Sequence, residues 1–129
     1  MGTQYLIDTN VIIDFSKGTI PADGNELVAH VIDTEPTISF INKIELLGFS
    51  SVSNAIIEFS ESANTLMCTE DIIKLCIDIR KQKKIKLPDA IIAATAISSG
   101  RILLTRNTSD FSGIDGLTVI NPHNLPPTS

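Results

Sequence analysis

The feature that most constrains this fold is the alternation of short apolar runs with longer segments of helical periodicity. Each run is three or four residues long and free of charged side chains, as in Tyr5-Leu6-Ile7. Strands that are apolar on both faces are typical of a parallel sheet covered by helices on both sides. We expect such strands at 5–7, 37–40, 66–68, 102–104 and 117–120. The sequence therefore predicts one three-layer α/β domain with about five parallel strands.

Length and composition agree with a single packed domain. The chain has 129 residues, of which 43% are hydrophobic, and it contains no internal repeat or linker. We expect a domain over residues 1–122 and an irregular tail over residues 123–129. No apolar run reaches transmembrane length and no signal peptide is evident, so the expected location is the cytoplasm, without a membrane contact. The two cysteines lack the spacing of a zinc site.

Four acidic residues lie in four separate apolar segments: Asp8, Glu45, Asp89 and Asp110. Burying a carboxylate is costly unless another group compensates its charge. Four neighbouring carboxylates would repel one another unless a cation such as Mg²⁺ or Mn²⁺ lay between them. The net charge of −5 argues against a protein that coats nucleic acid. It is compatible with an enzyme that binds a few phosphates with the help of bound cations.

The expected fold brings these acids to one edge of the sheet. Asp8 ends the first strand, and Asp110 lies in the loop after the fourth. Asp89 begins a helix, and Glu45 is in the first or second turn of the helix after the second strand. They converge if the first strand lies between the second and the fourth, because functional groups gather at the carboxyl ends of parallel strands. Taken singly, Asp8 also suits a turn or cap and Asp89 a helix start.

The segments around these acids resemble the PIN-domain ribonucleases, and most closely their VapC-type toxin branch. The similarity extends from about residue 5 to residue 122 and includes the closing segment at 116–122. It implies a five-stranded parallel sheet, an acidic pocket for Mg²⁺ or Mn²⁺, and cleavage of single-stranded RNA. It also implies a homodimer and an antitoxin encoded beside it. The motifs that carry it are Leu6-Ile7-Asp8-Thr9-Asn10, Ile44-Glu45-Leu46-Leu47-Gly48, Asp89-Ala90-Ile91-Ile92-Ala93-Ala94 and Leu103-Leu104-Thr105-Arg106-Asn107 with Asp110-Phe111.

The resemblance assigns roles to individual residues. Asp8, Glu45 and Asp89 match the three core acids, as catalytic and metal-binding residues. Asp110 matches the fourth acid, a more variable position for which Asp115 is a nearby alternative. Polar positions that shape the pocket in relatives are matched by Thr9, Asn10, Thr105 and Asn107.

A basic stretch and two histidines bear on the mechanism. The stretch comprises Arg80, Lys81, Lys83, Lys84 and Lys86. It is either a solvated helix end, where positive charge complements the helix dipole, or a binding surface for RNA phosphates. On the second interpretation Lys83, Lys84, Lys86 and Arg106 would contact RNA. We expect His30 and His123 to be bystanders, which favours a metal-dependent mechanism over a histidine-based nuclease.

Three other classes remain open from the residues alone. A haloacid-dehalogenase-like phosphatase also begins with a strand ending in Asp, but it needs a second Asp where Asn10 stands. A receiver-type signalling domain needs an acidic pair before its phosphorylated Asp. A catalytically inactive PIN-fold binding domain would retain the fold without its activity. Incubation with RNA in the presence and absence of EDTA separates these classes.

Overall fold

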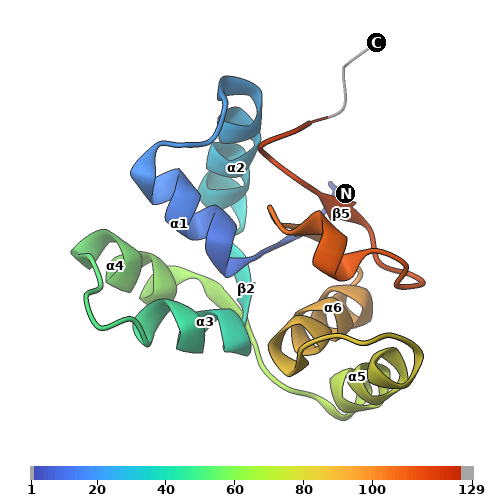
Figure 1. Ribbon diagram of the computed structural model, residues 1–129. Helices are drawn as coiled ribbons and strands as arrows, with labels where there is room; N and C mark the ends of the chain where they lie inside the picture. The colour runs from blue at the N-terminus through green and yellow to red at the C-terminus, as the bar shows by residue number, and fades with distance from the viewer. Residues whose placement is uncertain (1, 126–129) are drawn as a thin grey trace.

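The computed structural model describes residues 2–125, which form five short strands, six α-helices and one 3₁₀ helix (Figure 1). The strands are β1 (Tyr5–Ile7), β2 (Thr37–Ser39), β3 (Asn64–Leu66), β4 (Ile102–Leu104) and β5 (Val119–Ile120). The helices are α1 (Thr9–Lys17), α2 (Ala22–Thr34), α3 (Phe40–Leu47), α4 (Asn54–Ser62), α5 (Glu70–Gln82) and α6 (Leu87–Ser99), with η1 (Thr108–Phe111) as the 3₁₀ turn. The predicted α/β class is confirmed.

All the strand pairs are parallel, but the strands are not hydrogen-bonded as one continuous sheet. One ladder has the order β1-β4-β5, and the other joins β2 to β3. The prediction of a single five-stranded sheet is therefore wrong in one respect, because the hydrogen bonds form two separate parallel ladders. Strand β1 also packs beside β2, so β1 lies between β2 and β4. This is the arrangement that brings the predicted acids together.

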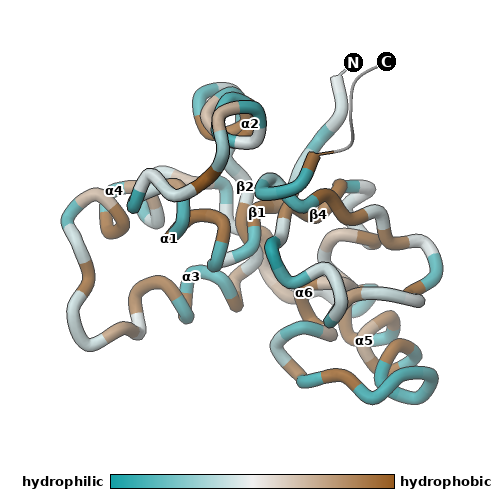
Figure 2. Tube along the Cα trace, turned by 45° about the horizontal axis from the view of Figure 1, so that its top comes forward, coloured by the Kyte–Doolittle hydropathy of each residue, from teal (hydrophilic) through white to brown (hydrophobic). Residues whose placement is uncertain are grey.

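Two hydrophobic cores lie on opposite faces of the strands and create the three layers. On β1, Leu6 belongs to the core formed with α5 and α6, whereas Ile7 belongs to the core formed with α1 to α4. On β4, Leu103 and Leu104 divide in the same way. Successive side chains of a strand point to opposite faces, so both faces must be apolar. Figure 2 shows β4 as a strongly hydrophobic segment among the helices.

Several predicted boundaries shift in the structure. The third strand occupies Asn64–Leu66 and not residues 66–68, because its pairing with Thr37–Ser39 sets its position. The segment of Asp110 is the 3₁₀ helix η1 and not an open loop. The fifth strand is shortened to Val119–Ile120. Helix α6 ends as expected at Gly100, whose φ of 66° is the left-handed conformation that glycine adopts readily.

The C-terminal segment packs closely against α2. Gly24 lies in that helix, and a Cβ added to it would lie 1.7 Å from the backbone oxygen of Pro122. Residues 121–125 form turns and bends, and most of the tail predicted over residues 123–129 lies outside the described part of the chain, which ends at residue 125. Within residues 2–125, the helices are too short or too polar to cross a membrane.

Candidate active site

Asp8 occupies the junction between β1 and α1. Its backbone N–H donates to Leu104 O at 2.9 Å, which extends the pairing of β1 with β4 by one residue. Its side chain then caps α1, since Oδ1 accepts a 2.8 Å hydrogen bond from Thr9 N. The residue is only 5% exposed. The end of a buried strand therefore holds this carboxylate in the interior, at the carboxyl edge of the sheet.

Neutral hydrogen-bond donors from three segments surround the Asp8 carboxylate. Thr105 Oγ1 donates to Oδ2 at 2.8 Å, and Asn42 Nδ2 donates to Oδ1 at 3.2 Å. Asn10 Nδ2 lies 3.3 Å from Oδ2. Burial is the main cause that raises the pKa of Asp8, and the hydrogen bonds from Thr105 and Thr9 offset it only partly. Nearby Glu45 and Asp89 raise that pKa further.

Glu45 is connected to Asp8 through Thr9. The residue lies in the second turn of α3, and its Oε1 accepts a 2.8 Å hydrogen bond from Thr9 Oγ1. The same hydroxyl accepts a 3.0 Å hydrogen bond from Asn42 Nδ2. Glu45 is exposed, in contrast to the buried Asp8. Its carboxylate therefore lies toward solvent, at the open side of the site.

Asp89 and Asp110 complete the acidic group from the other side. Asp89 is in the first turn of α6, as predicted, and is half-buried. Burial raises the pKa of Asp89, and the carboxylates of Asp110 and Glu45 raise it further, whereas Lys86 lowers it. Asp115 lines a different cavity, beside α5 and the end of α6. The structure thus brings Asp110, and not Asp115, close to the other acids.

One open cavity of about 350 Å³ contains three of the four acids. Asp8 lines it from the start of α1, Glu45 from the second turn of α3 and Asp89 from the first turn of α6. The sequence indicated the polar neighbours Thr9, Asn10, Asn107 and Arg106, all of which line the same cavity. It also contains four residues that sequence reasoning did not select: Ile13, Asp14, Lys17 and Phe49.

The predicted polar positions form a hydrogen-bonded network around Asp8. Thr105 is fully buried, and its Oγ1 accepts from Asn10 Nδ2 at 3.2 Å and from Asn107 N at 3.1 Å. Asn10 Oδ1 in turn accepts from Arg106 N at 3.0 Å. These contacts connect α1 to the segment after β4. The network therefore orients the Asp8 carboxylate, which lines the cavity together with Glu45 and Asp89.

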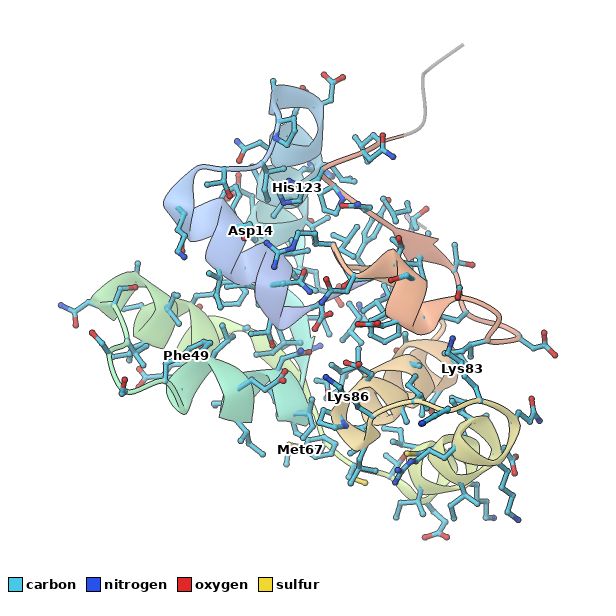
Figure 3. All side chains as sticks on the ribbon, in the orientation of Figure 1. Asp14, Phe49, Met67, Lys83, Lys86 and His123 are labelled. Atoms are coloured by element: carbon cyan, nitrogen blue, oxygen red, sulfur yellow. The ribbon has the colours of Figure 1, made fainter. Side chains whose placement is uncertain are left out.

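Arg106 and His123 meet at a buried carboxylate that sequence reasoning overlooked. Asp14 is 6% exposed, and both of its oxygens accept hydrogen bonds from Arg106 Nη1, at 2.9 and 2.8 Å. His123 Nε2 lies 2.9 Å from Asp14 Oδ2, and Figure 3 shows the two side chains together. His123 is therefore a structural contact between the C-terminal segment and α1, and the expectation that it takes no part in catalysis stays a prediction.

The basic stretch borders the acids through a second open cavity of about 510 Å³. Arg80, Lys83, Lys84 and Lys86 line it together with Asp89 and Asp110. Arg80 lies near the end of α5, and the three lysines lie in the link to α6. Figure 3 shows two of them, Lys83 and Lys86. Lys83 is also a structural residue, because its Nζ donates a 2.7 Å hydrogen bond to Ser112 O. The remaining lysines of this cavity, Lys84 and Lys86, are exposed.

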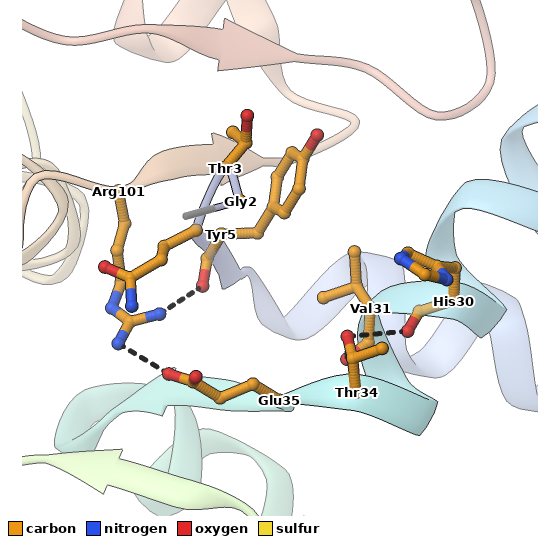
Figure 4. A pocket seen from close by; sticks show the side chains of 9 residues that line it. Gly2, Thr3, Tyr5, His30, Val31, Thr34, Glu35 and Arg101 are labelled. Atoms are coloured by element: carbon orange, nitrogen blue, oxygen red, sulfur yellow. Dashed lines mark hydrogen bonds and ion pairs between the residues drawn. The ribbon is translucent and has the colours of Figure 1, made fainter.

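A larger cavity of about 610 Å³ lies at the opposite ends of the strands (Figure 4). Arg101 crosses it, with Nη2 2.9 Å from Glu35 Oε1 and Nη1 donating to Tyr5 O at 3.3 Å. The lining includes residues that precede β1, β2 and β4. Its single carboxylate, that of Glu35, is paired with Arg101. The smaller cavity contains Asp8, Glu45 and Asp89, which form no ion pair among the described residues, and is therefore the better candidate for catalysis.

The donor chemistry of the acidic cavity fits a hard divalent cation. Carboxylate oxygens such as those of Asp8, Glu45 and Asp89 are the ligands that Mg²⁺ and Mn²⁺ prefer. Burial is the main cause that raises the pKa of Asp8 and Asp89, and a cation would relieve the smaller contribution from the neighbouring carboxylates. Within residues 2–125, no three acidic, histidine or cysteine side chains converge closely enough to enclose an ion. Mg²⁺ keeps several waters and needs only one or two carboxylates, so the residues fit an ion held partly through water.

Asn42 belongs to the site, although the sequence analysis did not select it. A local signal, the capping pattern at the start of α3, marks its position. Asn42 is fully buried, and its Oδ1 accepts from Ser39 N at 2.9 Å. Ser39 Oγ accepts from Ile41 N, so the two side chains form a capping box at the start of α3. The pattern Ser39-x-x-Asn42 after a strand predicts that cap. Only the fold shows that the Asn42 amide also reaches Asp8 and Thr9.

A parallel α/β/α fold with carboxylates at the carboxyl ends of its strands defines the class of this protein. The chain belongs to the PIN-domain family, whose model matches residues 5–117. Within that family it is of the VapC type. Ribonuclease VapC1 of Rickettsia felis is 31% identical over an alignment of 134 positions, which covers 89% of this chain and 93% of that protein.

Solved structures agree with this assignment. VapBC-1 from nontypeable Haemophilus influenzae contains a chain with a TM-score of 0.77 and 28% identity, and the match covers 95% of this chain and all of that one. A toxin–antitoxin complex from Klebsiella pneumoniae contains a chain with a TM-score of 0.69, 29% identity and the same coverage. The comparisons give no support to the phosphatase alternative.

Proposed function

We propose that this chain is a divalent-metal-dependent endoribonuclease that cleaves single-stranded RNA. One observation carries the proposal: Asp8, Glu45 and Asp89, from three separate segments, line one open cavity at the carboxyl ends of the strands. The similarity to a protein named Ribonuclease VapC1 supports the same activity. A group of unpaired carboxylates in a cleft is costly to maintain without a functional role.

The side chains in and around the cavity divide into three roles: metal binding, orientation of the acids and binding of the RNA backbone. Asp8, Glu45 and Asp89, with Asp110 beside Asp89, would hold Mg²⁺ or Mn²⁺. When bound, such an ion lowers the pKa of its water and offsets charge on the phosphodiester. Thr9, Asn42 and Thr105 orient the acids through hydrogen bonds.

Cations on both sides of the acids would bind the RNA backbone. Lys84 and Lys86 border Asp89 in the basic cavity, and Lys83 adds its charge while it holds Ser112. On the other side, Asp14 binds a single nitrogen of the Arg106 guanidinium. Arginine has five N–H donors, so the others stay available for phosphate oxygens. The two groups of cations would guide a strand across the carboxylates.

We further propose that the chain is the toxin of a toxin–antitoxin pair, acts in the cytoplasm and forms a homodimer. The related structures include a toxin–antitoxin complex and VapBC-1, which supports an antitoxin partner for this chain. Its surface offers apolar contacts for such a partner or for a second copy. Exposed aliphatic side chains on α3, on α5 and at the start of α6 include Ile44, Leu47, Ile73, Ile77 and Leu87.

The decisive experiment compares RNA cleavage by the parent protein and by Asp8→Asn, each with Mg²⁺, with Mn²⁺ and with EDTA. We expect the parent to cleave single-stranded RNA only with a metal ion and the variant to lose this activity, because one charge of the metal-binding group is removed. Equal cleavage by the folded variant would refute the role of Asp8. A parent protein that binds RNA but never cleaves it would be an inactive PIN-fold binding domain instead.

A further inference from the structure

We propose that Phe49 is a stacking platform for a nucleobase of the RNA substrate, next to the phosphodiester that the acids cleave. This inference rests on the proposed ribonuclease function and extends it to a substrate contact. Phe49 follows the end of α3, the helix that carries Glu45 (Figure 3). Among residues 2–125 it is the most exposed aromatic side chain, at 50%.

The backbone at the end of α3 holds Phe49 beside the cavity. Gly48 ends the helix, with its N–H donating to Ile44 O at 2.8 Å. A Cβ at position 48 would lie 2.8 Å from that same oxygen, a distance that real side chains almost never adopt. Glycine therefore permits the close turn that directs the chain from α3 into the segment containing Phe49. The aromatic ring is left half-exposed beside the acids, although burial would be worth a few kcal/mol for a phenylalanine (about 1.5–3).

The composition of the cavity matches the parts of a nucleotide. Phe49 lines the same cavity as Asp8, Glu45 and Asp89. Two cations, Lys17 and Arg106, line it as well. An aromatic face binds a base by stacking, whichever base it is, because every base has a π-face. The cations suit phosphate oxygens, and the acids suit the metal-dependent chemistry. Sequence-specific and non-specific RNA-binding proteins both bind unpaired bases on aromatic side chains in this way.

An apolar protein segment fits this cavity less well than a nucleotide. Such a segment would cover Phe49 but would also bury three carboxylates and the Lys17 ammonium, which form no ion pair among the described residues, and this burial is costly. A nucleotide offers an apolar face, a phosphate charge and polar sugar groups within one small unit. The mixture of one aromatic ring, two cations and four acids, of which Asp14 is already paired with Arg106, therefore favours RNA as the occupant.

The test uses the inactive Asp8→Asn protein in Mg²⁺, with a short single-stranded RNA and an abasic ribose-phosphate strand of equal length. Replacing Phe49 by Ala in this background should weaken binding of the RNA on the order of tenfold, because stacking accounts for about that much per base. Binding of the abasic strand should not change. Ile77→Ala is the matched control, since Ile77 is 48% exposed on α5 and lies outside this cavity. Thermal unfolding establishes that each variant is folded.

A fluorescent variant gives an independent measurement. The chain has no tryptophan, so Phe49→Trp introduces a single reporter at the proposed contact. Its emission should be quenched by the RNA and not by the abasic strand. The inference is wrong if Phe49→Ala leaves RNA affinity unchanged, or if it weakens both strands equally. Either result would leave Phe49 as a surface for a protein partner. The proposed function fails separately, if the parent protein does not cleave RNA.

Discussion

Thr9 Oγ1 donates a 2.8 Å hydrogen bond to Glu45 Oε1 and accepts a 3.0 Å hydrogen bond from Asn42. One hydroxyl at the start of α1 thus fixes an exposed carboxylate on α3. Thr9 also donates its backbone N–H to Asp8. The residue after the first acid therefore sets the position of the second one.

Replacing Thr9 by Val should lower kcat by about 10–100-fold, the usual cost of losing a residue that orients a metal ligand. RNA affinity should stay close to that of the parent, because the cations that bind the backbone are untouched. Thr9→Ser keeps the hydroxyl and should restore most of the activity. Steady-state cleavage kinetics of the three proteins decide the matter. A Val variant with parental kcat would show that Glu45 needs no orientation by Thr9.

Asn42→Ala should impair both stability and activity. Loss of the capping bond and of the bonds to Asp8 and Thr9 should destabilise the fold by about 1–3 kcal/mol and reduce cleavage by about 10–100-fold. Ser39→Ala is the matched control, because it removes the other half of the same capping box, at a cost of about 1 kcal/mol, without touching Asp8. Urea unfolding and cleavage rates measure the two effects. If Ser39→Ala lost as much activity as Asn42→Ala, the effect would belong to the helix cap alone.

The crowding around Asp89 predicts a pH dependence of stability in EDTA. The pKa of Asp89 is raised above its ordinary value of 3.8, mainly by burial and then by Asp110 and Glu45. Ionisation of Asp89 therefore destabilises the folded state as the pH rises from about 3.8 through the raised pKa, and the penalty is complete above it. Asp89→Asn should accordingly melt at a higher temperature than the parent at pH 7, and this advantage should shrink at pH 4.

The control for this effect is Asp23→Asn. Asp23 is also an acid in the first turn of a helix, so its replacement loses the same favourable interaction with the helix dipole. Asp23 is itself exposed, and it lies outside the cavity of the acids. We expect Asp23→Asn to show no such gain in melting temperature at pH 7. Equal behaviour of the two variants would contradict the crowding at Asp89.

Lys84→Ala with Lys86→Ala should weaken RNA binding and reduce its salt dependence. Each lost phosphate contact on a single strand lowers the log–log salt slope by about 0.7. Cleavage at saturating RNA should survive, because the acids are unchanged. Lys83 is left in place, since its bond to Ser112 would confuse binding with stability. The control is the double variant Lys74→Ala with Lys81→Ala, which makes the same change in net charge outside the basic cavity. If this control lowered the salt slope equally, the effect would come from net charge and not from phosphate contacts in the basic cavity.

Gly24→Ala should destabilise the protein by about 1–3 kcal/mol, the usual cost of overpacking. Inside a helix this change is normally stabilising, by roughly 0.5–1 kcal/mol, so the sign of the effect is informative. The new Cβ would lie 1.7 Å from Pro122 O and must displace the C-terminal segment. Gly2→Ala, with open space around it, should change little. Thermal unfolding compares the two, and a stabilised Gly24→Ala protein would mean that this segment is not packed on α2.

Sequence patterns were sufficient for the architecture and for the core of the candidate site. Short apolar runs and helical periodicity predicted the layers, because each strand had to be apolar on both faces, as Leu6 and Ile7 are. The positions of Asp8 and Asp89 at a strand end and a helix start follow from local signals in the chain. Local signals did not predict that the strands form two separate ladders, nor that β3 begins at Asn64. The position of β3 depends on its pairing with β2, which is distant in the sequence.

Only the tertiary structure determined which partners surround these residues. Asn42 reaches Asp8 across 34 positions of sequence, and Arg106 reaches Asp14 across 92. Phe49 follows Gly48 at the end of α3, but only the tertiary structure shows that it lines the acidic cavity. Local signals describe one element at a time, whereas these contacts depend on how α1, α3 and the segment after β4 pack against one another. The sequence by itself therefore determined the acids, and the fold decided what orients them and what lies beside them.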